Sequence, residues 1–386
     1  RDVAPSRGLG DVYKRQAQKD DTSEGAIVPD DILVIMNESW ADLSCAGDFE
    51  TNIPYNEFYT SLTENTIKGT ACVSIYGGNT PQSEYEFLTG NTISFLPSGA
   101  IAYNLYIKKD TPSLVSQLSE QGYECIAMHP EKATNFNRNQ VYPRLGFLQF
   151  LTEDDFTDVV KIRELCSDQS VYDKMIDLDE NKQEGQKLFL YGVTMQNHGG
   201  YTYEGEDFTP LVQTVGLNKT YDKVNQYLTC MRYTDEALEN LIGYFSDVDE
   251  HVMIVMFGDH HGDVGSDFYE ELYGKKLIDV EGEQYETRYE TPFFIWTNYE
   301  IGEKADEKIS LNYLSTLAMQ TANIPLTEYQ SFLAELQSHY PVISAAGIYD
   351  AEGNFYTWNN VEESADYSYM KEYQILEYYM LENYKK

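Results

Sequence analysis

The chain has 386 residues, a formal net charge of −37 and 42% hydrophobic residues. This hydrophobic content is that of a folded protein and excludes a disordered chain. The acidic balance argues against a nucleic-acid-binding protein, because such proteins carry a basic surface. No apolar run approaches the roughly 20 residues of a membrane span, and no signal peptide is visible. The length allows one large domain with an appendage, or two domains.

Short apolar runs alternate with segments of helical spacing through the first 300 residues. In chain order the sequence predicts a strand at 31–36, a helix at 57–66, a strand at 70–74, a helix at 81–89, a helix capped by Thr111-Pro112 and ending at Gly122, strands at 123–128 and 188–194, a helix at 219–246, and strands at 252–257 and 291–296. Such alternation favours an α/β fold with a mostly parallel central sheet flanked by helices.

The pattern changes after residue 300. Helices are predicted at 311–322 and 328–338, and strands at 342–349 and 354–358 form a hairpin that turns at Asp350-Ala351-Glu352-Gly353. We interpret 29–300 as one large α/β domain and 301–386 as a small α+β C-terminal subdomain.

The first residues differ from the rest of the chain. Residues 1–16 are basic and look like translated vector sequence, so 1–28 is interpreted as a non-native or disordered leader. The native protein is expected to begin further upstream, with an anchor.

The chain contains five cysteines, and no pair of them has C-x-x-C spacing. This wide spacing and odd number argue against a disulfide framework or a structural zinc site. We expect the cysteines to be small buried hydrophobic residues.

Three polar residues follow apolar runs that read as buried strands. Glu38 follows 32–36, and Asp259 and His260 follow 252–258, while Thr80 lies in a glycine-rich loop. In open α/β sheets the chemistry gathers at the carboxyl ends of the strands, so these four side chains are candidates to hold a divalent metal against a nucleophile. Each has a plainer interpretation: a capping carboxylate, a hydrogen-bonded turn, or a turn threonine. His261 is either an outer partner of the metal site or an exposed side chain.

Other segments supply hydrogen-bond donors for an anion. The loop at 77–80 leads into a helix, so its backbone N–H groups and the positive helix end suit a phosphate at Thr80. Arg138 is able to bind phosphate oxygens through its forked guanidinium, or to form a surface salt bridge. His198 follows another buried strand and is a donor to phosphate or to a leaving oxygen, or a structural histidine.

Taken in order, these pieces resemble the lipoteichoic acid synthase branch of the alkaline phosphatase/sulfatase superfamily. The matching pieces are Asn37-Glu38-Ser39, Gly78-Asn79-Thr80 with Glu84-Tyr85-Glu86-Phe87-Leu88-Thr89-Gly90, His129 with Phe136-Asn137-Arg138, Asn197-His198, Gly258-Asp259-His260, and Pro341-Val342-Ile343 with Gly347-Ile348-Tyr349-Asp350. The resemblance spans residues 30–355, and it implies that 29–300 is a sulfatase-like catalytic domain.

The resemblance implies one divalent metal, manganese first, with magnesium or zinc as alternatives. It makes Thr80 the nucleophile and places the metal ligands at Glu38, Thr80, Asp259 and His260. The substrate-contacting positions fall on His129, Glu131, Phe136, Arg138 and His198. The chain departs from the family at Phe136, where tryptophan is frequent, and at Pro81, where serine is common.

The implied activity is phosphoglycerol transfer from phosphatidylglycerol to a cell-envelope polymer or glycan, through a phosphothreonine, at the extracellular face of a bacterial membrane. The alternatives are a phosphoethanolamine transferase, a phosphodiesterase or sulfatase-like hydrolase, and a non-catalytic headgroup-binding module; a structural wall protein would not need this set of residues. A formylglycine sulfatase is disfavoured, because the residues after Cys72 do not form the C-x-P-x-R motif.

Overall fold

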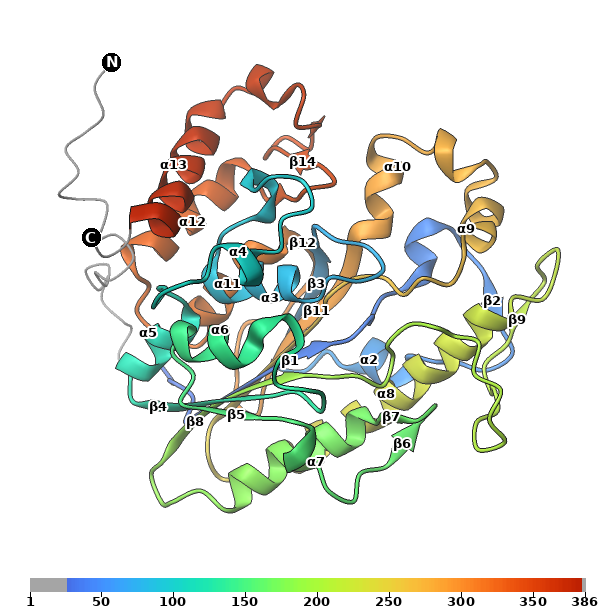
Figure 1. The fold of residues 1–386 in the computed structure, drawn as a ribbon, viewed down its shortest axis with the longest axis horizontal. Coiled ribbons are helices and arrows are strands. Elements are labelled where there is room, and N and C mark those ends of the chain that lie inside the picture. The colour runs from blue at the N-terminus through green and yellow to red at the C-terminus, as the bar shows by residue number, and fades with distance from the viewer. Residues whose placement is uncertain (1–25, 384–386) are drawn as a thin grey trace.

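The computed structural model describes residues 26–383 and is built around an eight-stranded sheet (Figure 1). The strand order is β12-β3-β11-β10-β1-β8-β4-β5. The bounds are β1 Asp31–Asn37, β3 Thr66–Cys72, β4 Tyr123–Met128, β5 Gln149–Leu151, β8 Lys187–Val193, β10 Val252–Gly258, β11 Glu290–Thr297 and β12 Lys304–Ser310. Only β11 runs against its two neighbours, β10 and β3. The predicted mostly parallel α/β fold is therefore confirmed.

Helices cover both faces of this sheet, because its central strand β1 is apolar on both sides. Ile32, Val34 and Met36 pack into one core cluster, and Leu33 and Ile35 into the other. The first cluster contains α3 (Pro81–Thr89), α4 (Ala102–Leu105), α5 (Leu114–Glu120), α6 (Arg138–Leu145), α11 (Leu311–Thr321), α12 (Glu328–His339) and α13 (Tyr367–Asn383); the second contains α7 (Asp168–Glu180), α8 (Asp222–Ser246) and α9 (Ser266–Tyr273).

Several smaller elements lie outside the main sheet. They are the helices α2 (Glu57–Ser61) and α10 (Glu283–Glu286), and the strand pairs β2 (Glu50–Thr51) with β9 (Thr214–Val215) and β6 (Lys161–Ile162) with β7 (Leu165–Cys166). None of the helices within 26–383 combines the length and hydropathy that a membrane span requires.

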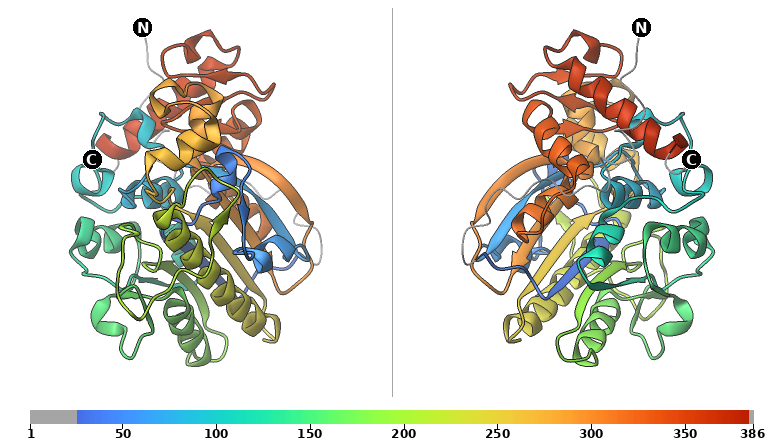
Figure 2. Two further views of the ribbon diagram at one scale, coloured as in Figure 1. Left: turned by 90° about the vertical axis from the view of Figure 1, so that its right-hand side faces the viewer. Right: turned by 90° about the vertical axis from the view of Figure 1, so that its left-hand side faces the viewer.

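The C-terminal elements gather at one end of the molecule, at the top of both views in Figure 2. A three-stranded sheet of β13 (Val342–Ile343), β14 (Ile348–Tyr349) and β15 (Phe355–Tyr356) lies between α12 and α13 along the chain. The predicted turn at 350–353 is therefore correct, but the strand predicted at 342–349 is divided into β13 and β14. Strand β12 pairs with β3 in the main sheet, so the main sheet extends past residue 300. The domain boundary predicted at residue 300 stays a prediction. Of the leader predicted at 1–28, residues 1–25 lie outside the described part of the chain.

Two predicted helices differ from the structure at their ends. The helix predicted at 57–66 ends at Ser61, and β3 begins at Thr66 after Asn65, whose backbone has a left-handed φ of 51°. The helix predicted after Thr111-Pro112 is capped by Ser113, whose side chain accepts a hydrogen bond from Ser116 N. Serine is a stronger N-cap than proline, which has no side-chain acceptor.

Candidate active site

The ends of two neighbouring strands bring the predicted carboxylates together. Strands β1 and β10 are parallel, and their register pairs Asn37 with Gly258, so the next residues, Glu38 and Asp259, leave the same sheet edge side by side. One ligand atom from each of Glu38, Asp259 and His260 lies within 4.8 Å of the others. All three are buried. The structure thus forms the three-residue cluster that the sequence predicts.

Hydrogen bonds around the cluster leave its inner atoms without partners. Asp259 Oδ1 accepts from Ser39 N (2.7 Å) and from His260 N (2.9 Å), whereas the buried Oδ2 has no hydrogen-bond partner. His260 Nδ1 lies 2.9 Å from the His261 carbonyl oxygen, so this nitrogen carries the proton and donates. The lone pair is then on His260 Nε2, which is also unpartnered and lies 3.1 Å from Asp259 Oδ2. Unpaired buried groups of this kind are costly, and a cation between them would satisfy both.

The charges in this cluster shift the pKa values of its members. Burial and the nearby negative charge of Glu38 raise the pKa of Asp259 to about 7. Burial lowers the pKa of His260, but the negative charges of Asp259 and Glu38 outweigh it, so the pKa is raised. Two acids and one imidazole that crowd together without a compensating positive charge fit a divalent cation. The mixed oxygen and nitrogen set suits manganese or zinc, and its carboxylates also suit magnesium.

Thr80 lies at the start of α3 and faces the same cluster. It is 8% exposed, and its hydroxyl donates to Glu38 Oε2 at 3.3 Å. Ser83, one turn further on, donates to the Asp259 carbonyl oxygen at 2.7 Å and so ties the helix to the end of β10. The hydroxyl that would attack is therefore held beside the candidate metal ligands.

The turn before α3 offers fewer backbone donors than the sequence suggests. Pro81 has no N–H, and the N–H groups of Gln82 and Ser83 donate to the carbonyl oxygens of Asn79 and Thr80. Binding of a phosphate at this helix end would therefore depend on side chains more than on the backbone.

The loop of Glu38 is held by residues that were not predicted as metal ligands or substrate contacts. Ser39 donates through Oγ to Glu38 Oε1 (2.8 Å), and Glu38 N donates to Thr194 Oγ1 (3.1 Å). Behind them the buried Asn37 donates to Asp168 Oδ2 (2.8 Å) and accepts from Asn197 Nδ2 (2.9 Å). Ser39 could be found from the sequence because it directly follows a predicted ligand, whereas no local pattern indicates Asp168.

Arg138 lies in the interior and is paired with Glu84. Its Nε donates to Glu84 Oε1 at 3.0 Å and Nη2 donates to the same oxygen, while Tyr103 and Tyr142 donate to Oε2. Both charged side chains are nearly fully buried. Arg138 does form a salt bridge, but the pair is buried, so the predicted surface location is wrong. Two of the guanidinium nitrogens are thus used by Glu84, and a substrate role for Arg138 stays a prediction.

The other predicted substrate positions surround Arg138 unevenly. His129 is buried, its Nδ1 lies 2.9 Å from the Val193 carbonyl oxygen, and burial together with the positive charge of Arg138 lowers its pKa well below the usual value. Phe136 has a left-handed φ of 52°, and its ring centre lies 5.5 Å from the Arg138 guanidinium carbon. Glu131 accepts from Asn135 Nδ2 at 3.3 Å, and His198 is exposed. Their substrate roles stay predictions.

His261 supports the site through its backbone. Its carbonyl oxygen orients His260, while its ring nitrogens lie near the Tyr269 hydroxyl (3.1 Å) and the Glu290 carbonyl oxygen (2.7 Å). Burial lowers the pKa of its ring to about 4, so the ring is neutral. The side chain is buried, which excludes the exposed alternative.

The sulfatase family model matches residues 30–324, so the chain belongs to the sulfatase family. It is 28% identical over 323 residues to a putative cyclic β-1,2-glucan modification protein of Rhizobium meliloti, a match that covers 81% of this chain and 49% of that protein. It is 31% identical over 216 residues to lipoteichoic acid synthase of Staphylococcus aureus, covering 52% of this chain and 31% of that protein. The chain thus spans about half the length, or less, of these two relatives.

Solved structures show the same fold. The phosphoglycerol transferase GacH of Streptococcus pyogenes has a TM-score of 0.72 at 22% identity, covering 96% of this chain and 89% of that chain. The lipoteichoic acid synthase LtaP of Listeria monocytogenes has a TM-score of 0.67 at 18% identity, covering 97% and 99%. The chain is therefore a member of the alkaline phosphatase/sulfatase superfamily with similarity to lipoteichoic acid synthases, as its motifs predict.

Proposed function

We propose that this chain transfers phosphoglycerol from phosphatidylglycerol to a hydroxyl group of a cell-envelope polymer or glycan, through a phosphothreonine at Thr80. One observation carries the proposal: the Thr80 hydroxyl is hydrogen-bonded to Glu38, inside a buried cluster where Asp259 and His260 present unpartnered ligand atoms. Two proteins of the same fold are described as a phosphoglycerol transferase in complex with sn-glycerol-1-phosphate and as a lipoteichoic acid synthase, which supports this donor class.

In this proposal Glu38, Asp259 and His260 hold one divalent cation, manganese first, with Thr80 as a further ligand. Such a cation lowers the pKa of the Thr80 hydroxyl and neutralises phosphate charge. Thr80 loses its hydroxyl proton and its Oγ1 bonds to phosphorus as the bond to the diacylglycerol oxygen breaks. That oxygen takes up a proton, which balances the step, and the exposed His198 donates a hydrogen bond to it. An acceptor hydroxyl then bonds to phosphorus, loses its proton and releases Thr80. Arg138 and His129 contact the phosphate oxygens, Phe136 packs against the glycerol, and Glu131 contacts its hydroxyls.

The proposed location is the extracellular face of a bacterial membrane, because the phosphatidylglycerol donor is a membrane lipid. A phosphoethanolamine transferase is the second candidate. The C-terminal periplasmic domain of EptC from Escherichia coli, solved in complex with zinc, shares the fold with a TM-score of 0.53 at 17% identity, covering 78% of this chain and 84% of that chain. The two candidates differ in the donor headgroup, and the mechanism at Thr80 is the same.

Release of labelled diacylglycerol from phosphatidylglycerol tests the proposal. It is measured with added Mn²⁺ or with chelator, for the wild type and Thr80→Ala, beside a parallel assay on phosphatidylethanolamine. Release that needs both the metal and Thr80 supports the proposal. Release from phosphatidylethanolamine alone would favour the second candidate, and release by Thr80→Ala equal to wild type would exclude the covalent step.

A further inference from the structure

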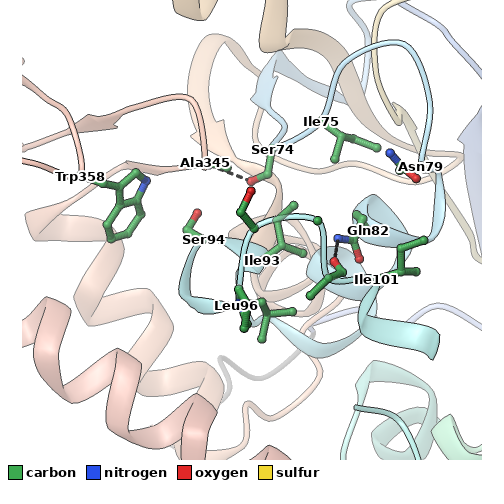
Figure 3. Close-up of a pocket in the computed structure, with 14 residues that line it drawn as sticks. Ser74, Ile75, Asn79, Gln82, Ile93, Ser94, Leu96, Ile101, Ala345 and Trp358 are labelled. Atoms are coloured by element: carbon green, nitrogen blue, oxygen red, sulfur yellow. Dashed lines mark hydrogen bonds between the residues drawn. The ribbon is translucent and has the colours of Figure 1, made fainter. Parts of the chain in front are cut away.

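A pocket of about 410 Å³ lies beside the loop that carries Thr80 (Figure 3). Three separate segments form it: the start of α3 with the preceding loop, the stretch 93–101, and the C-terminal residues Ala345 and Trp358. Asn79, which directly precedes Thr80, lines this pocket, and so does Gln82, two residues after it. A molecule bound here would therefore contact residues on both sides of Thr80 in the chain.

The lining of this pocket carries no ionisable side chain. All fourteen of its residues are uncharged, in a chain whose net charge is −37. A polyanionic acceptor, such as a glycerol-phosphate polymer, would find no cation here and would be repelled by the protein as a whole. The pocket instead combines serine hydroxyls and amide side chains with apolar groups such as Ile93 and Leu96, a composition that fits an uncharged ligand rich in hydroxyl groups.

Trp358 gives the pocket a fixed aromatic wall. Its Nε1 donates to the Ser344 carbonyl oxygen at 2.9 Å, and its ring lies edge to face with Phe95, with 5.5 Å between ring centres. The indole is thus held by this hydrogen bond and by this ring contact, and Figure 3 shows it at the opposite end of the pocket from Asn79. The C–H face of a sugar ring packs on an aromatic ring, while its hydroxyls bond to amides and serines.

Two side-chain amides, those of Gln82 and Asn79, lie at the Thr80 end of the pocket. The Gln82 amide is already used, because it donates to the Ala100 carbonyl oxygen (2.6 Å) and accepts from Ala102 N (2.9 Å). The Asn79 side chain, in contrast, is exposed and lines the pocket. Its backbone adopts a left-handed φ of 68°, and Figure 3 shows the amide at the pocket. Asn79 is therefore the group placed to orient an incoming hydroxyl.

We propose that this pocket is the acceptor subsite and that it binds a neutral saccharide unit, stacked on Trp358 and oriented by Asn79. This inference rests on the proposed function and narrows its acceptor from polymer or glycan to an uncharged glycan. A hydroxyl of the bound saccharide bonds to phosphorus as the bond to Thr80 Oγ1 breaks, and the proton of that hydroxyl passes to Thr80.

Binding and transfer are measured separately to test this subsite. Binding of a panel of short neutral oligosaccharides and of a short glycerol-phosphate oligomer is followed by saturation-transfer NMR on the protein without metal. Transfer is followed as the KM for the acceptor at saturating phosphatidylglycerol. The variants are Trp358→Ala, Trp358→Phe and Asn79→Ala, with Tyr378→Ala as the matched control, since Tyr378 is an aromatic residue on α13, 62% exposed, outside this pocket.

We expect a neutral oligosaccharide to bind, Trp358→Ala to weaken binding and raise the acceptor KM by about tenfold or more, and Trp358→Phe to restore most of the loss. Asn79→Ala should lower kcat for transfer more than it raises KM, and Tyr378→Ala should match wild type. The inference is overturned if no neutral oligosaccharide binds, if Trp358→Ala changes neither quantity, or if the glycerol-phosphate oligomer displaces the saccharide. Wild-type diacylglycerol release separates the two claims: its absence refutes the proposed function, whereas its presence with an unchanged acceptor KM refutes only this subsite.

Discussion

The buried pair of Glu84 and Arg138 predicts a large stability loss when the carboxylate is removed. The Glu84 carboxylate accepts two hydrogen bonds from Arg138 and one each from Tyr103 (3.1 Å) and Tyr142 (2.7 Å), and both charged side chains are almost inaccessible to water. Burial opposes the charge on the guanidinium, but Glu84 outweighs it and holds the pKa of Arg138 above its usual value. A guanidinium is protonated at any ordinary pH, so Arg138 stays charged when Glu84 is replaced. We expect Glu84→Ala to cost about 3–5 kcal/mol in the free energy of unfolding, because an uncompensated charge remains inside.

Urea unfolding followed by circular dichroism measures this loss. Glu84→Gln should lose less than Glu84→Ala, since its amide oxygen still accepts hydrogen bonds, and the double variant Glu84→Ala with Arg138→Met should be more stable than Glu84→Ala alone, because the buried charge is gone. A loss below about 1 kcal/mol for Glu84→Ala would refute the argument, as that is the value of an exposed pair. A double variant no more stable than Glu84→Ala would show that lost packing, and not the stranded charge, sets the cost.

Three further predictions follow from the site and from α13. Thr80→Ala should abolish diacylglycerol release, while its free energy of unfolding in urea stays within about 0.5–1 kcal/mol of wild type because only one weak hydrogen bond is lost; full release in this variant would contradict the assignment. Asp259→Asn should weaken Mn²⁺ binding at least about tenfold in isothermal titration, and unchanged affinity would place the metal elsewhere. Burial raises the pKa of Glu377 to about 8, from 4.5 in the unfolded chain. The folded state thus binds this proton more tightly, so wild-type stability should fall between about pH 4.5 and 8 relative to Glu377→Gln. Urea midpoints of the two proteins at pH 5 and 8.5 measure the difference, and a constant difference would refute it.

The sequence predicted the strands well where they are long, apolar and buried on both faces. Strand β4 has the predicted bounds, β1 and β10 are one residue longer than predicted, and β8 is shifted by one residue at both ends. The reversed direction of β11 was not predicted, because a buried strand has the same apolar pattern in either direction. Its direction depends instead on the chain between β10 and β11, which carries only short helices.

The candidate site was predictable where ligands follow strands directly. Glu38 and Asp259 are found together because β1 and β10 are neighbours in register, a consequence of the parallel sheet. The partner of Arg138 was not predictable, since Glu84 is 54 residues away and the pair forms only when α3 and α6 pack together. An isolated arginine in a sequence gives no information on whether its charge meets water, a substrate or a buried carboxylate.

Helix α3 connects the candidate site to the C-terminal elements, because every one of its nine residues is buried. Thr80 at its start contacts the candidate metal cluster, Glu84 one turn later holds Arg138, and Tyr85 donates to Glu377 of α13 at 3.0 Å. One helix thus contacts the candidate nucleophile, the buried arginine and α13. The same C-terminal region contributes Trp358 to the proposed acceptor pocket. The chemistry proposed for Thr80 therefore depends on how residues 301–386 pack against this helix.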